Sequence, residues 1–170
     1  MLDHEARVQA VAAQIRERAR AGQPVHIDKG GVHHVVPIPG DPRFRSGKLD
    51  TSALRQILEI DRDHMRCVAE PGVSFRDLVR ATLPLGLVPT VVPELEGITL
   101  GGAIAGGAVE SMSYRHGGFF DSVESLEIIT GTGEVLELSP TQHPELFHMI
   151  HGSYGTLGVI SRVSFRLIPA

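Results

Sequence analysis

The second half of this 170-residue chain contains a run of residues with almost no side chains. From Gly101 to Ala108 every residue except Ile104 is glycine or alanine. Glycine in a helix costs about 1 kcal/mol relative to alanine, so such a run needs a physical cause. Close packing of a short helix and close approach of a ligand explain it equally well at this point.

Thr99 is placed to cap a short helix that begins at this run. Unblocked amides at a helix start suit a pyrophosphate or another anion, especially where no side chains obstruct the approach. The run lacks the Gly-x-Gly-x-x-Gly spacing after a strand, so it is not a Rossmann fingerprint. A dinucleotide bound here would require another fold.

Two other glycine segments are candidates for ligand contact. The segment 152–160 would let main chain lie flat against a planar ring, with backbone groups of Val159 and Ile160 at the ring edge. The segment Lys29-Gly30-Gly31 would form an anion nest, followed closely by His33. Taken alone, a helix C-cap and an ordinary turn are simpler explanations of these two segments.

Local patterns predict alternating helices and strands. Asp3 caps a helix whose apolar residues recur every three or four positions, and which ends at Gly22. Ser74 caps another helix, and Gly131-Thr132-Gly133 predicts a hairpin. The remaining expectations are strands at 24–28, 57–60, 65–70, 123–129, 134–138 and 158–169, and helices at 75–83 and 144–150.

Charge and cysteine content exclude several classes of function. The formal charge is −4, from 16 basic and 20 acidic side chains, without the basic stripe that nucleic acids require. The single cysteine, Cys67, forms no intramolecular disulfide and is expected to be buried in a strand. No apolar run approaches the ~20 residues of a membrane span, and a cytoplasmic location is expected. His148 and His151 lack further ligands for zinc, so no metal is expected.

The ordered motifs resemble the FAD-binding domain of the vanillyl-alcohol oxidase and p-cresol methylhydroxylase (PCMH) superfamily. They are a glycine turn after the first strand, Glu70-Pro71-Gly72-Val73 before a helix, Pro93-Glu94 with Thr99-Leu100-Gly101-Gly102, His116-Gly117, and the segment 152–160. The run 92–113 and Gly155-Thr156-Leu157-Gly158 are most similar to the Δ24-sterol reductase branch. The resemblance covers nearly the whole chain.

The resemblance implies an α+β, PCMH-type fold of two α/β lobes, about 1–92 and 93–170, that clamp an extended FAD. It implies an FAD-dependent oxidoreductase with the amides of Gly101 and Gly102 near the pyrophosphate. Val32 separates Gly31 from His33, unlike the pattern in relatives that tether the flavin, so noncovalent binding is expected. The residues expected at the cofactor are Gly30, Gly31, His33, Pro93, Glu94, Thr99, Leu100, Gly101, Gly102, Gly106, Glu110, Ser111, His116, Gly117, Gly158, Val159 and Ile160. No catalytic residue is assigned.

Family members continue beyond the position of Pro169 into a substrate-binding domain. We therefore expect that domain to come from a longer form of this chain or from another polypeptide, and we expect the 170 residues to be incomplete for catalysis. A hydroxy-acid or alcohol oxidase of the same superfamily is an alternative. A domain that keeps the fold for protein interaction and no longer binds FAD is another, and the altered turn from Lys29 to His33 is its best support.

Overall fold

The computed structural model describes residues 3–28 and 46–170. Within them, β1 (Val25–Asp28) and β2 (Gly47–Asp50) form a small parallel sheet, and the other strands form a six-stranded antiparallel sheet. The larger sheet has the order β3-β4-β8-β6-β7, with β5 paired to β8. Its strands are β3 (Ile57–Asp61), β4 (Arg66–Ala69), β5 (Leu87–Pro89), β6 (Val123–Ile129), β7 (Val135–Leu138) and β8 (Val159–Pro169).

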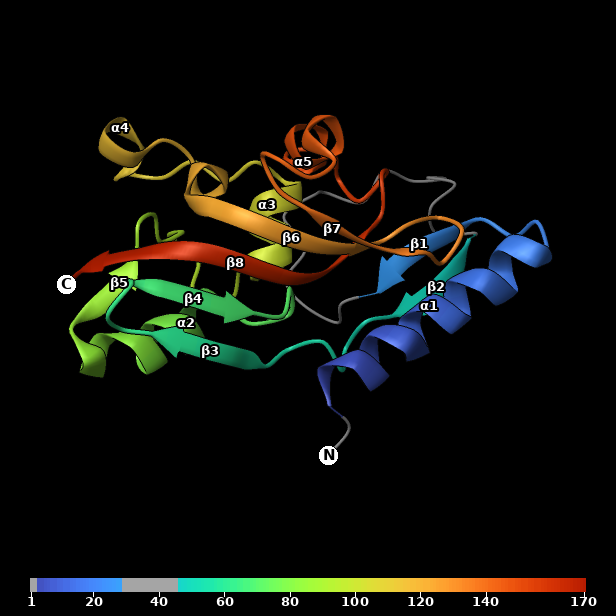
Figure 1. Ribbon diagram of the computed structural model, residues 1–170, viewed down its shortest axis with the longest axis horizontal. Helices are drawn as coiled ribbons and strands as arrows, with labels where there is room; N and C mark the ends of the chain where they lie inside the picture. The colour runs from blue at the N-terminus through green and yellow to red at the C-terminus, as the bar shows by residue number, and fades with distance from the viewer. Residues whose placement is uncertain (1–2, 29–45) are drawn as a thin grey trace.

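The central strand of the larger sheet is β8, which pairs with β4, β5 and β6 (Figure 1). Val163, Phe165 and Leu167 point into the core, and the residues between them are partly or fully exposed, as their alternation predicted. The Phe165 ring packs edge-on against Phe119, with ring centroids 5.3 Å apart. This strand thus organises the main hydrophobic core.

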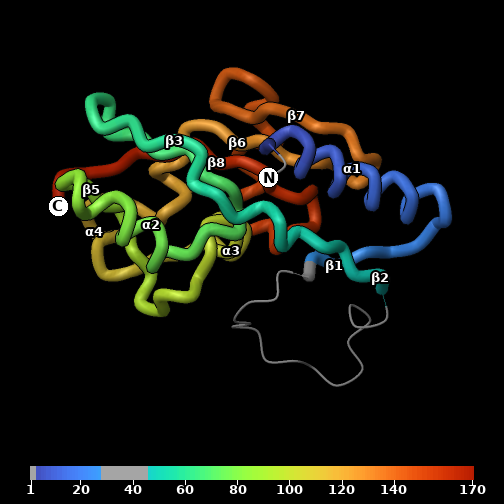
Figure 2. The backbone as a smooth tube through the Cα atoms, turned by 90° about the horizontal axis from the view of Figure 1, so that it is seen from below, coloured from blue at the N-terminus to red at the C-terminus, as the bar shows by residue number. Residues whose placement is uncertain are grey.

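Three of the α-helices described begin where a capping side chain accepts a hydrogen bond from a backbone amide. In α1 (His4–Arg20) the Asp3 carboxylate accepts the Ala6 N–H at 2.8 Å, as predicted. The other helical segments are α2 (Phe75–Thr82), α3 (Leu100–Ala105), α4 (Ser113–His116) and α5 (Pro144–Ile150), with 3-10 turns η2 (Leu83–Leu85) and η3 (Phe119–Ser122). Figures 1 and 2 place α2 and α3 together on one side of the larger sheet and α1 beside the small sheet. Among the described residues, no helix is long and apolar enough to cross a membrane.

The division between the two sheets lies in the chain segment between β2 and β3. The larger sheet therefore takes strands from both sides of residue 92, where the boundary between lobes is expected. The predicted hairpin is confirmed, since β6 and β7 pair across Gly131-Thr132-Gly133. Strand β2 is absent from the sequence-based prediction because Leu49 is its only buried side chain.

Candidate functional site

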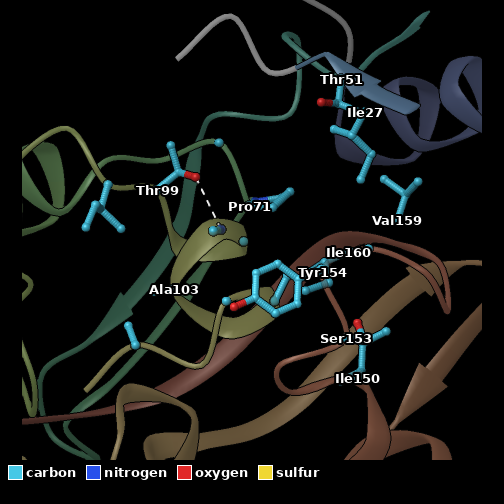
Figure 3. A pocket seen from close by; sticks show the side chains of 18 of the residues that line it. Ile27, Thr51, Pro71, Thr99, Ala103, Ile150, Ser153, Tyr154, Val159 and Ile160 are labelled. Carbon is cyan, nitrogen blue, oxygen red and sulfur yellow. Dashed lines mark hydrogen bonds between the residues drawn. The ribbon is translucent and has the colours of Figure 1, made fainter. Parts of the chain in front are cut away.

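A cavity of about 670 Å³ opens between three chain segments that are far apart in the sequence (Figure 3). These segments are the Pro71-Gly72 turn after β4, helix α3 with the residues that follow it, and the loop 151–158 that leads into β8. Ile27 of β1 and Thr51 after β2 extend the lining toward the small sheet. The volume is within the range of about 300–1,000 Å³ that is typical of small-molecule sites.

Helix α3 forms one wall of the cavity. Its predicted cap is confirmed, because the Thr99 Oγ1 accepts the Gly102 N–H at 3.3 Å. The Gly101 N–H is also occupied, since it donates to the Pro71 carbonyl at 2.9 Å. Both amides therefore help to hold α3 in place, and the expectation that they lie near the pyrophosphate stays a prediction. The helix presents the cavity with a surface that carries almost no side chains.

Gly101 and its neighbours explain the small-residue run in two ways. A Cβ atom at Gly101 would lie 2.7 Å from the Cβ of Pro71, far too close for two carbon atoms. Gly101 is thus needed for close packing of α3 on the turn after β4. Gly102, Ala103 and Gly106 line the cavity as well. Close packing, one of the two explanations given above, is confirmed at Gly101. Close approach of a ligand to the other small residues stays a prediction.

The loop 151–158 forms the facing wall and is tied to α3 through the backbone. The Gly152 N–H donates to the Ile104 carbonyl, and the Tyr154 N–H donates to the Ala105 carbonyl, both at 2.9 Å. At the end of the loop, Gly158 has φ +155°, and a Cβ there would lie 2.9 Å from the Ile129 carbonyl oxygen. The two glycine-rich segments of the sequence therefore meet across one cavity.

Few polar side chains line the described part of the cavity. Glu110 is its one carboxylate, and it contains no lysine, arginine or histidine. Ser153 also lines it, and the buried Ser153 Oγ has no hydrogen-bond partner among the described residues. Because a buried hydroxyl without a partner is unfavourable, a ligand with polar atoms would suit this position.

The structure brings together about half of the residues predicted for the cofactor site. Those that line the cavity are Thr99, Gly101, Gly102, Gly106, Glu110, Gly158, Val159 and Ile160. Those that lie outside its lining are Pro93, Glu94, Leu100, Ser111, His116 and Gly117. Leu100 is fully buried in the core and Glu94 is exposed on the surface, which explains their positions. Gly30, Gly31 and His33 lie outside the described residues.

Several lining residues have no local signal in the sequence. Ile27, Thr51 and Ile98 are ordinary residues in strands or loops. Pro71 and Gly72 belong to the motif 70–73, and this motif could have indicated that they line the cavity. The others become lining residues only because the sheets and helices pack in this order.

A buried ionic cluster of His4, Arg7, Glu70 and Glu127 lies next to the Pro71 turn. The Glu70 carboxylate is fully buried, and its Oε1 accepts from the Arg7 guanidinium at 2.7 and 2.9 Å. Its Oε2 accepts the Gln56 N–H at 2.7 Å. His4 lies between two carboxylates, with Nδ1 2.8 Å from Glu70 and Nε2 3.0 Å from Glu127. The cluster attaches the start of α1 to the residue that precedes Pro71, and sequence reasoning missed it.

A second hollow, of about 620 Å³, lies beside α5 and η3 and is lined in part by Phe120, Phe147, His148 and His151. Burial, and to a lesser extent the nearby His148, lower the pKa of His151, while Asp121 opposes this. No group of three or more metal-ligating side chains occurs in the described ranges, 3–28 and 46–170.

The single thiol is chemically inert. Cys67 lies buried in β4, as predicted. Burial raises its pKa to about 12, and the charge of Glu59 acts in the same direction. The thiol is therefore protonated at neutral pH and is not a nucleophile.

The chain is similar to known proteins in both sequence and fold. Residues 3–139 match the family described as "FAD binding domain". Delta(24)-sterol reductase of Pisum sativum is 37% identical over 128 residues, which is 75% of this chain and 23% of that protein. The enzyme of the same name from Rattus norvegicus is 31% identical over 168 residues, 98% of this chain and 33% of that protein.

Cytokinin dehydrogenase 9 of Oryza sativa subsp. japonica is 36% identical over 102 residues, 60% of this chain and 20% of that protein. The structure of 6-hydroxy-D-nicotine oxidase from Arthrobacter nicotinovorans superposes with a TM-score of 0.79 and 23% identity, over 95% of this chain and 35% of that one. The chain thus spans a third or less of the length of the matched sterol reductases.

Proposed function

This chain belongs to the family of FAD binding domains, and from that premise we propose that the cavity between α3 and the loop 151–158 holds FAD without a covalent bond. The family match and the structural likeness confirm the expected FAD cofactor and the expected α+β, PCMH-type fold. The binding residues and the noncovalent attachment are the proposal.

The shape of the cavity is the observation that carries the proposal. One wall is the nearly bare surface of α3, and the other is a loop whose backbone is fixed to α3 by two hydrogen bonds. Such walls admit a flat ring at van der Waals distance, because no side chain holds it away. The Ser153 hydroxyl, which has no hydrogen-bond partner in the described part of the chain, adds a polar contact for the ligand. The residues present therefore fit FAD.

The charge of the cavity lining bears on the position of the FAD diphosphate. The described lining offers the Glu110 carboxylate and no cationic side chain, and like charges at short distance repel. We therefore place the phosphates away from Glu110. The expected phosphate contact at 29–33 stays a prediction, because these residues lie outside the described part of the chain.

When bound, FAD supplies a flavin ring that accepts or delivers a hydride, which amino-acid side chains do not provide. The chain's own part is to hold the ring between α3 and the loop and to exclude water from the covered face. For the reaction, we propose reduction of a sterol side chain or a related oxidation, supported by the 37% identity to the pea protein over 75% of this chain. Because the chain spans only 23% of that protein, the substrate contacts are assigned to other residues.

The test uses the purified 170-residue chain. We expect a yellow protein that binds FAD more tightly than FMN and releases its flavin completely on acid denaturation. Gly102→Val should weaken FAD binding by roughly tenfold or more, since the branched side chain would occupy the bare wall. Gly131→Val is the matched control, because Gly131 lies in the β6–β7 hairpin with open space around it. A colourless chain that does not take up FAD would refute the proposal, and flavin retained by denatured protein would refute noncovalent attachment.

A further inference from the structure

Tyr154 adopts a backbone conformation that is rare for a bulky residue. Its φ is +54°, in the left-handed region, where residues other than glycine and asparagine are strained. Gly152 and Gly155, on either side of it in the loop, also have positive φ and are glycines. Glycine would therefore satisfy the backbone at position 154 better than tyrosine does. Met65 and His143 share this conformation, but neither of them lines the cavity, so Tyr154 is the residue of the three whose side chain is placed to contact a ligand there.

The backbone of Tyr154 is held at the cavity by a hydrogen bond. The Tyr154 N–H donates to the Ala105 carbonyl at 2.9 Å, which ties the residue to the last turn of α3. The ring is nevertheless 72% exposed and lines the cavity. Figure 3 shows it extending from the loop over the space beside α3. Gly102, Ala103 and other small residues line the same cavity.

An exposed aromatic ring beside a bare wall forms a slot for a flat ligand. The Tyr154 hydroxyl has no hydrogen bond to the described part of the chain, so its oxygen is not what holds the side chain there. Aromatic faces stack on planar rings in an offset or edge-on arrangement. FAD carries two such planar systems, the isoalloxazine and the adenine.

We propose that Tyr154 stacks on one of the two planar ring systems of FAD, and that the strained conformation of this residue is retained for that contact. This inference rests on the function proposed above. The glycine segment 152–160 was expected to contact the ligand through its main chain, and this inference assigns a binding role to the side chain of Tyr154. Removal of the ring should weaken FAD binding and at the same time relieve backbone strain.

The test measures FAD affinity and thermal stability of the flavin-free protein for Tyr154→Gly, Tyr154→Asn and Tyr154→Phe. For the first two we expect affinity about fivefold weaker and an unchanged or higher unfolding midpoint, because both residues tolerate positive φ. Tyr154→Phe keeps the ring and should bind within about twofold of the wild type. Tyr114→Ala is the control, since Tyr114 is 84% exposed on α4 and does not line the cavity.

Parallel titrations identify the ring that Tyr154 contacts. If it is the isoalloxazine, Tyr154→Gly weakens binding of FMN; if it is the adenine, the same variant weakens binding of ADP. Unchanged FAD affinity in Tyr154→Gly and Tyr154→Asn would overturn the inference. So would a joint loss of stability and affinity in both variants, because that result indicates a structural role. A wild-type chain that does not bind FAD would instead refute the proposed function, and this inference with it.

Discussion

Replacing Arg7 by methionine should destabilise the protein far more than replacing an arginine on its surface. The Glu70 side chain is fully buried and accepts two hydrogen bonds from the Arg7 guanidinium, at 2.7 and 2.9 Å. Methionine retains most of the apolar stem of arginine but leaves the carboxylate without this partner. Loss of one partner from a buried ion pair costs about 3–5 kcal/mol, because the remaining charge is buried without compensation.

The contacts that remain around Glu70 favour the lower end of that range. His4 Nδ1 is still 2.8 Å from Glu70 Oε1, and the Gln56 N–H still donates to Oε2 at 2.7 Å. We therefore expect a loss of about 3 kcal/mol. For a domain of this length each kcal/mol lowers the unfolding midpoint by about 2–4 °C, so the midpoint should fall by roughly 6–12 °C.

The assay is thermal and urea unfolding of the flavin-free protein, since a bound ligand would raise the stability of every variant by mass action. Arg76→Met is the matched control, because the Arg76–Glu96 pair is exposed, at 44% and 67% of the two side chains. An exposed pair contributes about 0–1 kcal/mol, so this control should lose only a few degrees. If Arg7→Met lowers the unfolding midpoint no more than Arg76→Met does, the buried pair of Arg7 and Glu70 does not stabilise the folded protein.

Three further outcomes test other parts of the structure. Gly101→Ala should lower the free energy of unfolding by about 1–3 kcal/mol and weaken FAD binding, because the new Cβ would lie 2.7 Å from the Pro71 Cβ. Gly131→Ala should change neither, because no atom lies within 4 Å of a Cβ at that position. Equal urea midpoints for the two variants would contradict this prediction. Burial lowers the pKa of His151 below its ordinary value of 6.5, so below that pH the unfolded chain binds a proton at His151 more readily than the folded chain does. The free energy of unfolding should therefore fall as the pH drops below about 6.5, and it should fall less steeply in His151→Phe. Parallel pH profiles of the two proteins would show that His151 is not responsible. With its pKa raised to about 12, Cys67 should not react with a thiol reagent at pH 8 in the folded protein and should react once urea unfolds it; rapid reaction of the native chain would disprove its burial.

Local chemistry in the sequence was sufficient for most of the secondary structure. Asp3 and Thr99 cap α1 and α3 as predicted, because a cap needs only a side-chain oxygen and an amide two or three residues later. The alternation in β8 likewise predicted which face is buried. The ordered glycine motifs also indicated an FAD binding domain, and the family match over residues 3–139 confirms it.

Only the tertiary structure decided which partners the individual amides and charged side chains have. The amides of Gly101 and Gly102 were expected to lie near the pyrophosphate, and only the structure shows that Pro71 and Thr99 accept their hydrogen bonds. Arg7 and Glu70 are 63 residues apart, and His4 and Glu127 are 123 apart. No local spacing identifies such partners, because a side chain pairs with whatever the packing of helices on sheets brings within about 3 Å. The exposed Tyr154 ring and the Ser153 hydroxyl become parts of a cavity for the same reason: the loop that carries them folds back onto α3.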